Sequence, residues 1–151
     1  GDQCDVATAT ARAREFRQEL DDLRQRYGGR PVLRAFFQIS ARPLYTVTGR
    51  QIISQAMTLC GGRNVFAEAP GLVAQVSAES VLAADPQVIL ATAGGDDDAL
   101  AWWREFGSMA AVRRGNLYLV DADLVSRPGP RLPAGIGQIC ERIETARERS
   151  D

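Results

Sequence analysis

Apolar side chains recur every three or four residues through the first segment of the chain. This spacing places them on one face of a helix, and charged side chains fill most positions between them. The apolar stripe consists of Val6, Ala9, Ala13, Phe16, Leu20, Leu23 and Tyr27. Gly28 and Gly29 end the periodic segment, and Pro31 follows them. The pattern predicts a helix over about residues 5–27, roughly 33 Å long at 1.5 Å per residue.

The remainder of the chain alternates short apolar runs with amphipathic segments. The predicted strands span residues 31–37, 88–92 and 117–120, with a short extended piece at 64–66. Two predicted helices begin after the N-caps Thr48 and Ser77. A third contains Trp103, a single helical turn covers residues 109–112, and a last helix covers residues 131–147. We expect residues 38–46 and 71–75 to be loops.

This alternation of strands and helices defines the expected fold class. It is typical of an α/β fold whose mostly parallel central sheet is covered by helices on both faces. We therefore expect a three-layer, Rossmann-like lobe preceded by a long helix that packs against it rather than forming a coiled coil. Ligands of such sheets bind in the loops at the carboxyl ends of the strands. Those loops are residues 38–46, 93–98 and 121–130.

Composition narrows the range of possible chemistry. The net charge is −1, so nothing favours nucleic acid or an acidic membrane surface as a partner. The chain has no histidine, which removes the commonest general base, the Ser–His and Cys–His pairs and nearly all zinc sites. No apolar run approaches the ~20 residues that a membrane-spanning helix needs. The chain contains three cysteines, Cys4, Cys60 and Cys140; their spacing does not choose a disulfide pair, and on spacing alone buried free thiols are favoured.

No catalytic constellation is visible in the sequence. Dinucleotide, phosphate-loop, nucleophile-elbow and zinc-protease motifs are missing, so we expect no enzyme and no metal site. Polar side chains instead gather in two of the expected ligand loops, Arg42 with Tyr45 in the first and Asp123 with Arg127 in the last. Such side chains bind amides, carboxylates or phosphates. The alternative is that Asp123 satisfies only its own turn.

Three blocks of the sequence resemble the C-terminal lobe of the periplasmic binding proteins that serve ABC importers. The blocks are RPLYTVTGRQIISQAMTLCGGRNVF, QVSAESVLAADPQVIL and NLYLVDADLVSRPGPRLPAGIGQIC, in the order that the family has. The branch they resemble is the helical-backbone class, which carries cobalamin, haem and ferric siderophores, and the pattern is most like its cobalamin-binding members. The resemblance implies two α/β lobes joined by a long helix. Residues 1–29 would then be the interlobe helix and 30–151 the C-terminal lobe, with the N-terminal lobe absent from this chain.

The resemblance also implies roles for individual residues in ligand binding. Tyr45 matches an aromatic side chain that packs on the corrin ring, and Asp123 and Arg127 match polar ligand contacts. Arg42 would pair with an anionic ligand such as a siderophore. The cobalamin-binding members carry a tryptophan where this chain has Val73.

The resemblance also implies a docking role for Glu79 and a disulfide between two of the cysteines. Glu79 matches a glutamate that docks on arginines of the permease, although Glu79 is also expected in a capping box begun by Ser77. Cys60 and Cys140 match a disulfide-linked pair, which suits an oxidising periplasm.

The expected function is that of a periplasmic solute-binding component of an ABC importer. It would capture cobalamin or a related corrinoid as a non-covalent ligand, hold no cofactor, and deliver the ligand to the permease without inserting into the membrane. One alternative is a haem or ferric-siderophore binder of the same class, with Tyr45 as an iron ligand. An alternative from another class is an interaction module that dimerises through its long helix.

Overall fold

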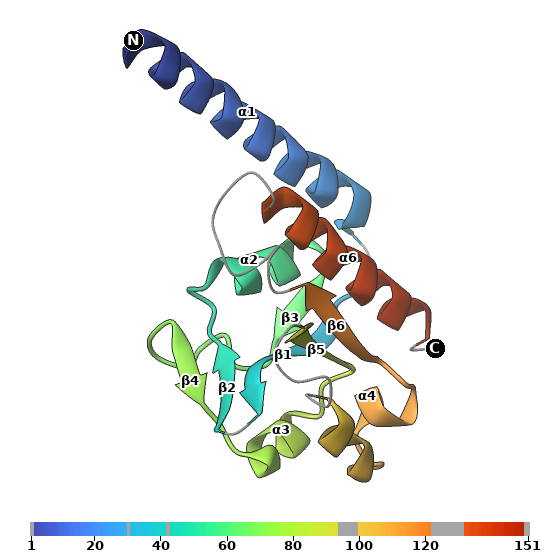
Figure 1. Ribbon diagram of the computed structural model, residues 1–151. Helices are drawn as coiled ribbons and strands as arrows, with labels where there is room; N and C mark the ends of the chain where they lie inside the picture. The colour runs from blue at the N-terminus through green and yellow to red at the C-terminus, as the bar shows by residue number, and fades with distance from the viewer. Residues whose placement is uncertain (1, 30, 42, 94–99, 122–131, 150–151) are drawn as a thin grey trace.

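The protein is a three-layer α/β body from which one long helix projects (Figure 1). The computed structural model describes residues 2–29, 31–41, 43–93, 100–121 and 132–149. The strands are β1 (Leu33–Ala41), β2 (Leu44–Val47), β3 (Gly62–Asn64), β4 (Val73–Gln75), β5 (Val88–Ala93) and β6 (Leu117–Asp121). The helices are α1 (Asp2–Tyr27), α2 (Ile52–Leu59), α3 (Ala78–Ala84), the 3₁₀ helix η1 (Ala101–Glu105), α4 (Ala110–Arg113) and α6 (Leu132–Glu148).

The sheet is largely parallel, as the sequence predicts. Its strand order is β4-β2-β1-β5-β6, and β3 pairs with the first part of β1. The pairs β1–β3, β1–β5 and β5–β6 are parallel. Only the wing formed by β2 and β4 runs antiparallel to its neighbours among the described strands. The α/β fold class is therefore confirmed, with an antiparallel extension at one edge.

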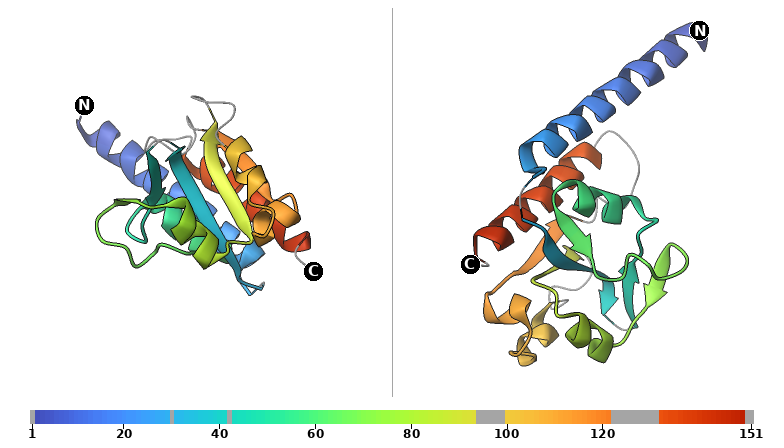
Figure 2. Two further views of the ribbon diagram at one scale, coloured as in Figure 1. Left: turned by 90° about the horizontal axis from the view of Figure 1, so that it is seen from below. Right: turned by 180° about the vertical axis from the view of Figure 1, so that it is seen from behind.

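Both faces of the sheet are covered by helices, because the strands are apolar at consecutive positions. Phe37 and Leu90 face a core shared with α1, α2 and α6, whereas Phe36 and Ile89 face a core shared with α3, η1 and α4. The two helical layers lie on opposite sides of the sheet in Figure 1 and Figure 2. Trp103 is fully buried in the second core, and its indole Nε1 donates a 2.7 Å hydrogen bond to Gln38 of β1.

The described side chains of the apolar stripe on α1 pack against the body, as predicted. Phe16, Leu20 and Leu23 are partly buried against the first core, and Tyr27 is fully packed into it. The helix begins at Asp2, earlier than predicted, and its N-terminal half extends away from the body (Figure 1).

Two segments predicted as loops are strands, and these predictions were wrong. β1 continues to Ala41 and pairs antiparallel with β2, so residues 38–41 and 44–46 belong to two adjacent strands. Residues 73–75 form β4 at the edge of the sheet. Thr46 of β2 is buried, and its hydroxyl donates to the carbonyl of Phe37 at 2.7 Å.

The predicted helix cap at Ser77 is confirmed, whereas the cap at Thr48 and the capping box with Glu79 are wrong. Ser77 caps α3, because its Oγ accepts from the backbone N–H of Ser80 at 3.1 Å. Ser80 occupies the third helical position, so the expected capping box with Glu79 is wrong. Thr48 does not cap α2, which follows Gln51. The Thr48 hydroxyl instead donates to the carbonyl of Gly71 and fastens β2 to the segment before β4.

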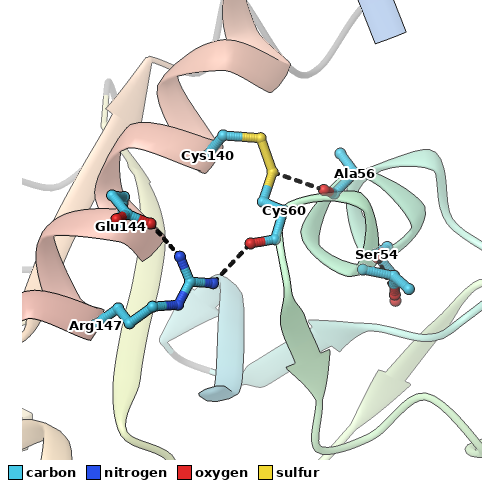
Figure 3. The surroundings of a disulfide bond; sticks show 7 residues. Ser54, Ala56, Cys60, Cys140, Glu144 and Arg147 are labelled. Atoms are coloured by element: carbon cyan, nitrogen blue, oxygen red, sulfur yellow. Dashed lines mark hydrogen bonds and ion pairs between the residues drawn. A yellow bond between two sulfur atoms is a disulfide. The ribbon is translucent and has the colours of Figure 1, made fainter. Parts of the chain in front are cut away.

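The Cys60–Cys140 disulfide is present and lies in the first core (Figure 3). Both cysteines are fully buried, and their Cα atoms are 5.2 Å apart. Arg147 lies nearby on α6 and is 9% exposed. Its guanidinium donates to the carbonyls of Pro31 and Cys60, each at 2.8 Å, and forms an ion pair with Glu144. The disulfide and Arg147 together fasten α6 to the end of α2 and to the entry of β1.

Asp85 ends α3 in a left-handed conformation with φ of 48°. Its Oδ1 accepts a 2.9 Å hydrogen bond from the backbone N–H of Ala110, and its carbonyl accepts one from Arg34. We expect Asp85→Ala to lower the free energy of unfolding by about 1–2 kcal/mol, because it removes the acceptor and strains the backbone. Asp85→Asn should stay within about 0.5 kcal/mol of the parent, because asparagine keeps the acceptor and tolerates this conformation.

Urea denaturation of the two variants measures this difference. The Asp85 carboxylate also lies 3.8 Å from the Arg34 guanidinium, in a pair that is about half exposed. Equal destabilisation by Asp85→Asn and Asp85→Ala would assign the stability to this ion pair instead of to the hydrogen bond.

Candidate ligand-binding surface

The carboxyl ends of the parallel strands meet at one edge of the sheet. β1 and β5 point the same way in the left view of Figure 2, and β6 runs parallel to β5. Ligands of α/β sheets bind at this edge. Three of the predicted ligand residues, Arg42, Asp123 and Arg127, lie outside the described residues. Tyr45 is the predicted ligand residue whose position is described.

Tyr45 lies on β2 rather than on a turn. Its Cα is paired with Ser40 of β1 and with Gln75 of β4. Val47, two residues further along, is 1% exposed in the core beneath α2 and α6. Side chains two positions apart share a face of the sheet, so Tyr45 faces the same side as Val47, nearer the hairpin turn. Tyr45 is only half-buried there, which leaves part of its ring open to solvent.

Two exposed apolar side chains lie beside Tyr45 on the neighbouring strands. Ile39 on β1 is 39% exposed, and Val73 on β4 is 47% exposed. The β1–β2 register shifts between Gln38 and Ser40, and such a bulge sets Ile39 and Ser40 together opposite Tyr45. Val73 is paired with Val47, so it lies diagonally across from Tyr45 at a distance that side chains can bridge. We name Ile39, Tyr45 and Val73 the wing surface.

Sequence analysis missed Ile39, because the loop predicted over residues 38–46 gives its side chain no defined face of the sheet. Only the bulge brings Ile39 beside Tyr45. The signal that could have found it is a large aliphatic residue close to the turn residue Pro43.

The wing surface suits contact with an apolar or planar ligand. The ring of Tyr45 offers a face for stacking, and the aliphatic neighbours bury apolar area. In the part of the chain that the structure describes, no group of three or more His, Cys, Asp or Glu side chains is placed to hold a metal ion. No helix among the described residues is both long enough and apolar enough to cross a membrane.

Glu79 lies apart from the wing surface in the chain, in the first turn of α3. Its side chain is exposed. An acidic residue in the first turn is favourable beside the helix N-terminus, so its position needs no partner to be stable. Exposure leaves it accessible to another protein.

Comparison with known proteins confirms the family resemblance. No protein-family model matches the sequence. The chain is 34% identical over 139 residues to the vitamin B12-binding protein of Vibrio parahaemolyticus, covering 91% of this chain and 50% of the relative. It is 33% identical over 137 residues to that of Vibrio cholerae, with the same two shares. The chain thus spans about half the length of the curated relatives it matches.

Solved structures agree with this similarity. The crystal structure of the periplasmic vitamin B12-binding protein of Vibrio cholerae matches with a TM-score of 0.77 and 35% identity, over 89% of this chain and 52% of that one. A possible iron-binding periplasmic solute-binding protein from Staphylococcus epidermidis matches with a TM-score of 0.79 and 23% identity, over 89% and 54% of the two chains. The second match shows the shared fold alone.

Proposed function

We propose that this chain is the C-terminal lobe of a periplasmic solute-binding protein that captures cobalamin or a related corrinoid for an ABC importer. Residues 1–29 would form the interlobe helix and residues 30–151 the lobe. The similarity to vitamin B12-binding proteins supports this proposal, and those relatives are binding proteins rather than enzymes. Binding in the cleft between two lobes would be non-covalent.

The observation that carries the proposal is the half-open ring of Tyr45 within the wing surface. Tyr45 lies beside the hairpin turn at the ligand edge, with Ile39 opposite it and Val73 diagonal to it. A corrin is a broad ring with an apolar face. Laying that face on the wing surface removes apolar area from water on both partners, at about 25 cal/mol per Å².

Polar groups would fix the orientation of the ligand. We propose that Asp123 and Arg127 accept and donate hydrogen bonds to the amide side chains of a corrinoid, with Arg42 beside them. Glu79 would serve a different step, docking the loaded lobe on arginines of the permease. Its exposure on α3 supports this role.

A second candidate ligand is haem or a ferric siderophore. Val73 favours it, because an aliphatic side chain stands where the resemblance places a tryptophan in the cobalamin-binding members. Tyr45 would then donate its phenolate to iron instead of stacking its ring.

Substitutions at Tyr45 separate the two ligands. For a corrinoid we expect Tyr45→Ala to weaken binding about 30-fold, equivalent to about 2 kcal/mol, because the stacking surface is lost. Tyr45→Phe should bind within about twofold of the parent, because it keeps the ring. The measurement is calorimetric titration of the longest natural polypeptide that contains this chain, with cyanocobalamin, haemin and a ferric siderophore in turn.

The control is Val32→Ala, since Val32 is 65% exposed and lies outside the wing surface. It should leave every affinity unchanged. Binding of a ferric ligand but not of cyanocobalamin would overturn the corrinoid assignment. A loss of iron-ligand binding in Tyr45→Phe, with loss of its visible absorbance band, would establish the phenolate as a metal ligand. Unchanged corrinoid affinity in Tyr45→Ala would exclude the wing surface as the site.

A further inference from the structure

A groove lies between α1 and α2, on the face of the sheet that α1, α2 and α6 cover. Its volume is about 510 Å³, within the range of small-molecule sites. Phe16 and Leu20 of α1 form one wall, Ile52 and Leu59 of α2 form the other, and Ile136 of α6 closes the floor. All five are apolar side chains.

Two small residues in the lining leave the groove open. Gly28, just after α1, and Ala56 on α2 both line it and contribute little or no side chain. Phe16, Leu20 and Leu59 are consequently only partly buried, and Ile52 is 40% exposed. An apolar ligand in the groove would remove this surface from water, a gain of about 25 cal/mol per Å².

The groove has one charged side chain among the described residues that line it. This is Arg24, which is placed one helical turn beyond Leu20. Arg24 lies 3.8 Å from Asp21, but the two side chains are 68% and 49% exposed. Exposed pairs of this kind are weak, so the guanidinium can exchange Asp21 for a stronger bidentate partner. Gln55 and Thr58 add neutral polar groups to the lining.

We infer that this groove binds a single-chain amphipathic carboxylate, with its acyl chain between α1 and α2 and its carboxylate on Arg24. The apolar walls fit the chain, and the single cation fits the head group. A volume of about 510 Å³ suits one acyl chain better than a two-chain lipid. The site is separate from the wing surface, so it does not depend on the ligand proposed above.

Titration with dodecanoate tests the inference. In heteronuclear NMR spectra of the 151-residue chain, dodecanoate should shift the amide signals of residues in α1 and α2 in a saturable manner. Arg24→Glu should weaken this binding about tenfold or more, because a charge-assisted pair becomes a repulsion. Arg17→Glu is the matched control. It reverses an exposed charge on the same helix outside the groove, and it should leave the affinity within about twofold.

A second variant and a second probe complete the test. Ile52→Trp places a bulky ring at an exposed position of the groove wall and should weaken binding without unfolding the chain. Dodecyltrimethylammonium carries the same chain with a positive head and should bind at least tenfold more weakly than dodecanoate. Equal binding of the two probes, or no effect of Arg24→Glu, would overturn the inference. A dimer in sedimentation that does not bind dodecanoate would also overturn the inference, because a second copy of the chain would then close the groove.

Discussion

Replacing Cys60 and Cys140 together by alanine should lower the free energy of unfolding by about 4.5 kcal/mol. The disulfide joins residues 80 positions apart, and the chain-entropy model gives about 4.5 kcal/mol for closing a loop of this length in the unfolded state. This is a large part of the 5–15 kcal/mol typical of whole domains. Urea denaturation with and without the double substitution measures the change.

Cys4→Ala is the matched control for this experiment. It removes a thiol without opening the Cys60–Cys140 bond, so it should not reproduce the loss. Because both sulfur atoms are buried, reductant should act on the parent mainly after unfolding and should lower its stability to that of the double variant. An unchanged denaturation midpoint under reducing conditions would show that the bond contributes little to stability.

Arg147→Met should destabilise the fold by about 3 kcal/mol. Methionine matches the length of the arginine stem but leaves the carbonyls of Pro31 and Cys60 without these donors. It also leaves Glu144, which is 18% exposed, without its cation. Removing one member of a largely buried ion pair costs about 3–5 kcal/mol. Because Glu144 is partly exposed, we expect a loss of unfolding free energy at the lower end of this range. Thermal and urea denaturation both report this loss.

Two companion variants identify the cause. Arg147→Lys keeps the charge but loses the planar fork, so it should recover less than half of the lost stability. Arg147→Met combined with Glu144→Gln removes the carboxylate that has lost this ion pair and should be more stable than Arg147→Met alone. If Arg147→Lys were as stable as the parent, the charge rather than the geometry of the two carbonyl bonds would explain the effect.

The elements that sequence analysis predicted correctly are those with a local cause. The stripe through Phe16 and Leu20 makes an amphipathic helix whatever surrounds it, and the run 88–92 is apolar at every position but Thr92. Ser77 caps α3 through a bond to Ser80, three residues away. Each of these signals lies within a few residues of its effect.

The elements that it missed depend on distant partners. Gln38 is polar and suggested a loop, but it is buried because Trp103, 65 residues away, donates to it. Thr46 is buried for a similar reason, through the carbonyl of Phe37. The contact with Trp103 is not visible in a window of neighbouring residues, and the contact with Phe37, nine residues before Thr46, forms only when β1 and β2 pair. The sequence alone therefore predicts loops where the hairpin and β4 lie.

The candidate site also combines features that the sequence reveals with features that only the tertiary structure reveals. Tyr45 was singled out by its place in a predicted ligand loop and received its role from a family resemblance, whereas its strand position and its pairing with Ser40 and Gln75 are tertiary facts. Ile39 lies beside Tyr45 because of a bulge in β1, and no residue type in the sequence predicts that bulge. The Cys60–Cys140 pairing was also implied by resemblance, because spacing alone does not choose two of three cysteines.

The attachment of α6 also has a consequence for the order of folding. Arg147 bonds to Pro31 across 116 residues, and Cys140 bonds to Cys60 across 80. The first core therefore cannot close until α6 is available, even though β1, α2 and β3 precede α6 by many residues. Contacts of such long sequence separation slow folding, because the loops must close before their contacts form. A nascent chain would hold Phe37, Met57 and Leu90 exposed until α6 is available.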